Sequence, residues 1–155
     1  MNQDMQIRNI KSKELIPAIE SVLSSGISAK IKVTGNSMYP FLRDGVDSVM
    51  FSPVKPNNLK RGDIILARRE TGQHVLHRIA RKGENSIYIL GDAQEMVEGP
   101  LLPEQVIAVV TSVWRKEKMF ACSGLGWRTL SLLWLLVRPF RRYILYSYRT
   151  LRRWI

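Results

Sequence analysis

The sequence predicts a mainly β fold, in which a coiled antiparallel β-domain follows an N-terminal helix and precedes C-terminal amphipathic helices. Short alternating or continuous apolar stretches recur between residues 29 and 114, separated by turns rich in glycine, proline and asparagine. Evenly spaced short strands of this kind are typical of antiparallel sheets that coil or close. The chain has 155 residues, 45% of them hydrophobic and 24% charged, which suits one domain with its own core.

The predicted elements follow in order along the chain. Residues 12–25 carry five apolar side chains at helical spacing, so we expect a packing helix there. We expect strands, each bounded by turn residues, at residues 29–34, 46–51, 64–67, 73–81, 86–90 and 105–114. From Gly124 onward the chain is densely apolar, and Pro139 is expected to separate two helices.

Charge divides the chain into two parts. The formal net charge is +11, and residues 118–155 contain Lys118 and seven arginines but no acid. The tail therefore carries +8, whereas residues 1–117, with 16 basic and 13 acidic side chains, carry only +3. We expect a β-rich domain over residues 1–117 and a cationic helical tail over residues 118–155. Residues 124–155 should not be needed for the β-domain to fold. A cationic tail binds nucleic acid, acidic protein or anionic lipid.

The many leucines between these charges favour an anionic membrane surface as the partner. Nucleic acid would bind the arginines but would not explain the leucines. Residues 140–155 would place apolar and arginine side chains on opposite sides of a helix. The expected membrane-binding residues are Trp127, Trp134, Arg138, Arg141, Arg142, Arg149, Arg152 and Arg153. The apolar run Leu130–Val137 is shorter than the about 20 residues of a spanning helix, so we expect interfacial helices, with a C-terminal anchor as the alternative. No signal peptide is expected at the N-terminus, and the side of the membrane stays open.

Ser37 is the candidate nucleophile. It lies in Gly35-Asn36-Ser37-Met38-Tyr39-Pro40, directly after a predicted strand, where a sharp turn can hold a hydroxyl at the surface. Serine needs a base to take its proton, and the chain has only two histidines. His77 is the candidate base, and His74 lies on the opposite face of the same strand. A purely structural turn serine is the alternative.

An acid must hold the imidazole ring, and two acids are candidates. Asp92 follows the strand expected to pair with that of His77, and Glu98 comes shortly after it. Asp92 is the first candidate, because a hairpin could bring it back beside His77, and Glu98 is the alternative. Asp92 could also be an ordinary turn residue. The single cysteine, Cys122, allows neither an intramolecular disulfide nor a cysteine metal cluster, and we expect no metal or other cofactor.

Four segments resemble, in order, the conserved boxes of the type I signal peptidases. The segment Gly35–Pro40 resembles the serine box, and Arg61–Ile65 resembles the next box, Gly-Asp followed by apolar residues. Leu76–Ile79 is similar to the box with the general base, and Gly91-Asp92 is similar to the last box. The resemblance covers residues 31–114. It places His77 where the family has either lysine or, in the endoplasmic reticulum and archaeal form, histidine.

The resemblance implies a serine endopeptidase that cleaves signal or leader peptides. Ser37 would be the nucleophile, His77 the base and Asp92 the acid of the last box, with Glu98 standing where a second family acid lies. The substrate would bind as an extended strand, with small residues before the cut. Gly35 replaces a hydroxyl residue of many bacterial members, so the oxyanion would be bound by the Ser37 N–H, with Thr34 or Asn36 as a second donor.

Two other functions compete with this prediction. The self-cleaving repressors share the β-fold and a similar Gly-x-Ser-Met turn, so the chain could be a regulator of that kind. Their base is lysine, however, and their DNA-binding domain precedes the serine, where this chain has only about 30 residues. The third hypothesis is a catalytically inactive relative that acts as a membrane or protein adaptor. The presence of all three catalytic residue types argues against it.

Overall fold

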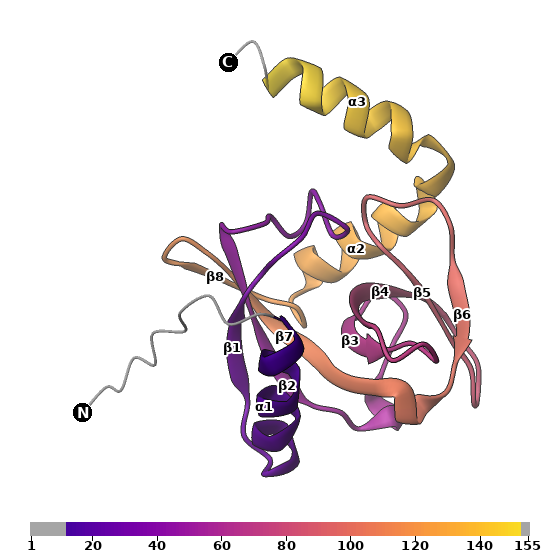
Figure 1. Cartoon of the computed structure of the whole chain (residues 1–155). Coiled ribbons are helices and arrows are strands. Elements are labelled where there is room, and N and C mark those ends of the chain that lie inside the picture. The colour runs from indigo at the N-terminus through magenta and orange to yellow at the C-terminus, as the bar shows by residue number, and fades with distance from the viewer. Residues whose placement is uncertain (1–11, 153–155) are drawn as a thin grey trace.

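The computed structural model describes residues 12–152 (Figure 1). Three helices, α1 (Ser12–Ser24), α2 (Leu125–Leu136) and α3 (Arg141–Arg152), flank the strands, and a short 3-10 turn, η3 (Arg138–Phe140), links the last two. Two further 3-10 turns, η1 and η2, span Pro56–Asn58 and Pro103–Gln105. The strands are β1 (Ala29–Lys32), β2 (Asp47–Pro53), β3 (Ile64–Arg68), β4 (His74–Lys82), β5 (Ile87–Leu90), β6 (Glu98–Leu101), β7 (Val106–Arg115) and β8 (Lys118–Ala121).

All eight strands form one antiparallel sheet in the order β1-β2-β7-β3-β4-β5-β6, with β8 paired to β7. This confirms the predicted mainly β fold with flanking helices. The register shifts at Met50/Phe51, Leu66/Ala67, Ile79/Arg81 and Ile87/Ile89, and at the first two places the extra residue lies on β7. Such irregularities bend a strand and increase its twist, which accounts for the strongly coiled sheet in Figure 1.

The core consists of two apolar clusters on opposite faces of the central strands. On β3, Ile64 and Leu66 belong to one cluster, which α1 covers, whereas Ile65 and Ala67 belong to the other. Both faces of β3 are therefore buried, and this explains its continuous apolar run. The register pairs Ile65 with His77, so the histidine faces the second cluster, and the next residue of β4 faces the first.

The sequence analysis does not predict β6 and β8. β6 contains Gly99 and Pro100, two residue types that are rare in strands, and the four residues of β8 are all exposed, so no alternation marks them. Residues 118–121 thus belong to the sheet and not to a helical tail. The helix break expected at Pro139 is present as η3. Within residues 12–152, no helix combines the length and the apolar character needed to cross a bilayer.

The side chain that follows His77 on β4 is a buried arginine. Arg78 is 0% exposed and donates from Nε and Nη2 to the two carboxylate oxygens of Asp92, at 2.8 and 2.6 Å. Its Nη1 donates to the Gly62 carbonyl at 2.9 Å and to Ser131 Oγ of α2 at 2.7 Å, and the guanidinium lies 4.4 Å from the centre of the Phe41 ring. Every nitrogen of this guanidinium therefore has a partner, Nε and Nη2 on Asp92 and Nη1 on two further segments.

A second buried arginine fixes the helical tail to the loop after β5. Arg141 donates from Nη1 to the carbonyls of Gly91 and Gln94, at 3.1 and 3.0 Å, and from Nε and Nη2 to the carbonyl of Trp134. The indole of Trp134 donates to the Asp92 carbonyl at 3.0 Å. Burial lowers the pKa of the Arg141 guanidinium to about 10, which leaves it charged at neutral pH. The tail thus completes the packing of the β-domain.

Asp92→Asn should lower the free energy of unfolding by about 3–5 kcal/mol, because it leaves the buried Arg78 without its counter-charge. Glu104→Gln, at an exposed position, is the control and should change it by less than about 0.5 kcal/mol. Urea unfolding followed by tryptophan fluorescence measures both. Equal midpoints for the two variants would show that the pair does not stabilise the fold.

The contacts of Ser131, Trp134 and Arg141 argue against the expectation that the tail is dispensable for folding. A chain ended at Ser123 retains every strand but exposes the Arg78–Asp92 pair. We expect it to lose more than about 3 kcal/mol of stability, through unpaired buried groups and lost apolar burial. Thermal unfolding by circular dichroism checks this, and a melting temperature equal to that of the full chain would refute it.

Candidate active site

The turn that carries Ser37 is anchored on both sides. Gly35 has a φ of +87°, a conformation that glycine adopts readily, and its N–H donates to Asp44 Oδ1 at 3.1 Å. Met38, only 1% exposed, inserts into the first apolar cluster, and its carbonyl accepts from the Leu42 N–H at 2.9 Å. Ser37 itself is half-buried. A fixed backbone on each side holds the serine at a defined place on the surface.

The serine turn is bonded to the loop that follows β5. The Ser37 carbonyl accepts a hydrogen bond from the Ala93 N–H at 2.8 Å. A Cβ atom at Gly91 would lie 2.8 Å from that same carbonyl, so a glycine is needed for the close approach. The Gly-Asp turn predicted from the sequence is thus a contact point between two candidate site segments. Asp92, between these two residues, points away into the ion pair with Arg78.

His77 is 3% exposed, and its Nδ1 atom lies 3.4 Å from Glu98 Oε1. Within the described residues this nitrogen has no hydrogen-bond partner, so the contact with Glu98 is one of charge and proximity. Burial lowers the pKa of His77 from its usual value of 6.5, and the negative charge of Glu98 opposes that shift in part. The imidazole is therefore neutral at pH 7, the state that a general base requires.

Glu98, the first residue of β6, is held in place by an arginine that the sequence analysis does not single out. Arg69 donates from Nε to Glu98 Oε2 at 2.7 Å and from Nη2 to Oε1 at 2.6 Å. This two-point contact lowers the pKa of the Glu98 carboxyl, which is therefore ionised at neutral pH. The result is a chain of charged and polar groups that runs from Arg69 through Glu98 to His77.

The acid that contacts His77 is Glu98, the alternative candidate, and not Asp92, the first candidate. Asp92 is fully buried, and its carboxylate is paired with the Arg78 guanidinium. The charge of Asp92 raises the His77 pKa less than the charge of Glu98 does. The expectation that Asp92 orients the imidazole finds no contact to support it. The other histidine, His74, lies 3.9 Å from Glu20 of α1 and so belongs to a different surface.

Ser37 and His77 are not joined by a hydrogen bond within residues 12–152, although both border the segment 91–98. The N–H groups of Ser37 and Asn36 donate no hydrogen bond inside the described part of the chain, which leaves them available for an oxyanion. Thr34 and Asn36 are both exposed. In the same described range, no three histidine, cysteine or acidic side chains are grouped to hold a metal ion.

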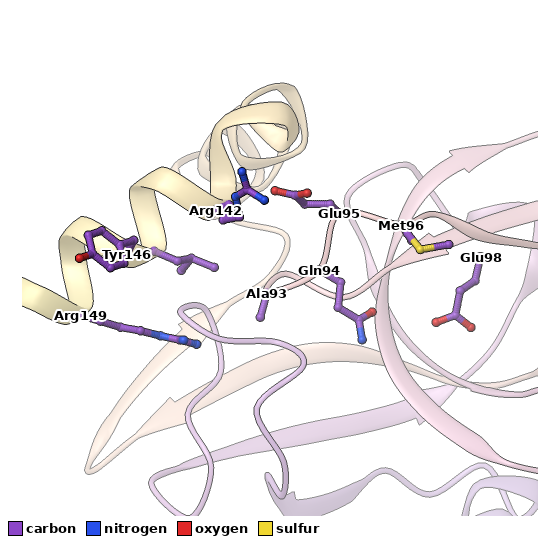
Figure 2. A pocket seen from close by; sticks show the side chains of 9 residues that line it. Ala93, Gln94, Glu95, Met96, Glu98, Arg142, Tyr146 and Arg149 are labelled. Carbon is purple, nitrogen blue, oxygen red and sulfur yellow. The ribbon is translucent and has the colours of Figure 1, made fainter.

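A pocket of about 700 Å³ opens between the segment 93–98 and α3. Figure 2 shows Arg142, Tyr146 and Arg149 projecting from α3 on one side and Glu95 and Glu98 on the other. The pocket is lined by Ala93, Gln94, Glu95, Met96, Glu98, Arg142, Leu145, Tyr146 and Arg149. It therefore adjoins Glu98, the acid that contacts the candidate base.

Helix α3 also reaches the serine turn. The ring of Tyr148 lies 6.0 Å from that of Tyr39, and the Arg149 guanidinium lies 5.9 Å from the centre of the Tyr39 ring. The tail thus borders both the turn of Ser37 and the pocket next to Glu98.

The residues expected to bind a membrane lie on two different sides of the tail. Trp127 and Trp134 face inward, with their rings 5.7 and 5.9 Å from that of Phe41, and Arg141 is buried. An amphipathic pattern alone does not reveal which side faces the protein, and here the tryptophans pack on the domain. The exposed arginines are Arg138, Arg142 and Arg149. The side chain of Arg152 and all of Arg153 lie outside the described residues.

The charges around His77 predict opposite pKa shifts in two variants. Glu98→Gln removes a charge that raises the His77 pKa, so the pKa should fall further below 6.5. Arg69→Gln removes a charge that lowers it, so the pKa should rise relative to the wild-type protein. Nuclear magnetic resonance titration of the imidazole nitrogens measures both, and His74→Gln assigns the signals. Shifts of the same sign would contradict the described contacts.

The family model described as Peptidase S24-like matches residues 3–113, which include Ser37, His77 and both candidate acids. No curated protein matches the chain. The match supports a serine-peptidase-like protein or a related regulator, and it agrees with the antiparallel sheet described above. Because the match spans more than half of the sequence, the chain belongs to the Peptidase S24-like family.

Proposed function

We propose that this protein is a serine endopeptidase of the histidine-base, signal-peptidase-like kind, with Ser37 as nucleophile, His77 as general base and Glu98 as the acid that orients it. The observation that carries the proposal is the buried His77, whose lowered pKa keeps it neutral and whose Nδ1 lies against an ionised carboxylate. A structural histidine does not require a carboxylate that is itself fixed by an arginine. The peptidase family match supports the same chemistry at a coarser level.

The proposed reaction uses the two imidazole nitrogens differently. Because Nδ1 faces Glu98, Nε2 is left to accept the Ser37 proton as Oγ bonds to the carbonyl carbon of the substrate. The Ser37 N–H stabilises the oxyanion. His77 then gives the proton to the leaving amine as the C–N bond breaks, and a water molecule, activated by the same nitrogen, hydrolyses the acyl-enzyme.

The pocket beside Glu98 is the proposed place of the peptide. Its walls combine apolar side chains, Met96 and Leu145, with charged groups, which suits an extended segment with small or apolar residues near the cut. The four-box resemblance supports signal or leader peptides as the substrate class. Histidine at position 77, instead of the lysine of the self-cleaving repressors, is what favours a peptidase over a repressor-like regulator.

Ser37→Ala and His77→Ala should each reduce kcat/KM for peptide cleavage by about 10³-fold or more, and the double variant should be hardly worse, because the two residues act as a unit. His74→Ala is the matched control and should retain activity. The wild-type rate should rise with pH, with the midpoint of the rise below 6.5, since the His77 pKa is lowered from that value. The assay uses a fluorogenic peptide library with small residues before the cut.

Cleavage by Ser37→Ala at the wild-type rate would refute the serine mechanism. A wild-type protein that cleaves no peptide, yet keeps its fold, would instead support the non-cleaving regulator or adaptor.

A further inference from the structure

The solvent-facing side of α2 consists mainly of leucines, with Thr129 as an exposed polar residue among them. Leu125, Leu130, Leu133 and Leu136 are between 51% and 86% exposed, and no charged residue lies among them. The one charged residue of α2, Arg128, is turned toward the sheet, where it donates to Asp63 Oδ1 at 3.1 Å. Surface helices ordinarily carry polar residues on this side, so a row of exposed leucines indicates a surface that is covered in use.

Exposed apolar and aromatic side chains continue from α2 through η3 into α3. Phe140, Tyr143 and Leu151 are each more than 60% exposed, whereas Leu145 and Arg141, on the other side of the helix, are buried. Phenylalanine and tyrosine bury well at a boundary between apolar and aqueous phases, because the ring is apolar and the tyrosine hydroxyl stays solvated. The inner sides of both helices are already fixed to the protein, so only the outer sides are available to a partner.

The charges next to these apolar residues identify the kind of partner. Arg138 is exposed beside them, and residues 118–155 contain no acidic side chain at all. A second copy of the chain would bring like charges together, and nucleic acid offers nothing for the leucines to contact. An anionic bilayer offers both a negative surface and an apolar layer beneath it.

We propose that the exposed sides of α2, η3 and α3 form a docking surface for an anionic lipid bilayer, and we call it the tail surface. It consists of Leu125, Leu130, Leu133, Leu136, Phe140, Tyr143 and Leu151, with Arg138 beside them. In the view of Figure 1, α3 lies at the end of the molecule opposite α1, so the tail can approach a bilayer while α1 remains in solvent. The proposal does not depend on peptidase activity.

The test is co-sedimentation of the full chain with vesicles of phosphatidylcholine alone and of phosphatidylcholine mixed with phosphatidylglycerol. Wild-type protein should bind the anionic vesicles at least about tenfold more tightly than the neutral ones, and added salt should weaken that binding. The double variant Leu130→Gln/Leu133→Gln should lose at least about tenfold in affinity for anionic vesicles. Both leucines are exposed, so the fold should be retained, and circular dichroism verifies this.

The matched control is the double variant Ile27→Gln/Leu102→Gln, which replaces two equally exposed apolar residues outside the tail and should bind as the wild type does. Equal binding by the two double variants would overturn the proposal, as would equal binding of the wild type to neutral and anionic vesicles. Analytical ultracentrifugation without lipid gives an independent reading. A wild-type dimer that the Leu130→Gln/Leu133→Gln variant loses would assign the surface to a second copy instead.

Discussion

The bidentate ion pair between Arg78 and Asp92 is the interaction on which the candidate site depends. Two charges without solvent contact are tolerable only when the remaining donors find partners, and the Arg78 guanidinium does so on two further segments. The pair fixes the loop after β5, and that loop in turn holds the Ser37 carbonyl and leads to Glu98. Asp92 therefore stabilises the fold and does not contact His77. The acid that faces His77 is Glu98, which is partly exposed and held by an arginine.

The tail has two sides with different relations to the site. The inner side of α3 lines the pocket next to Glu98 and contacts the ring of Tyr39 near the serine. The outer side carries the exposed apolar residues of the tail surface. If the two proposals are taken together, a peptide in the pocket lies between the catalytic groups and a helix that rests on lipid. This arrangement gives a physical reason for a peptidase to act on segments that emerge at a membrane surface.

Much of this arrangement could be predicted from the sequence, because alternation and turn residues mark the strands, and a serine turn and few histidines restrict the chemistry. The sequence indicated Asp92 as the acid beside His77, whereas Glu98 is the acid that contacts it. Strand periodicity places His77 and Arg78 on opposite faces but does not say toward which face the Gly-Asp loop closes. The inward packing of Trp127 and Trp134 could not be predicted either, because the apolar side of a helix has the same sequence pattern whether protein or lipid covers it. The strand β8 has no buried side chain and therefore left no pattern.

The claim that Ser37 is a nucleophile activated by His77 can be tested without knowing the substrate. A fluorophosphonate reacts with an activated serine, whose oxygen bonds to phosphorus as fluoride leaves, and tandem mass spectrometry then locates the modified residue. The account predicts one modified serine, Ser37, in the wild-type protein and a large loss of its labelling in His77→Ala. Labelling at another serine, or equal labelling of Ser37 with and without His77, would contradict it.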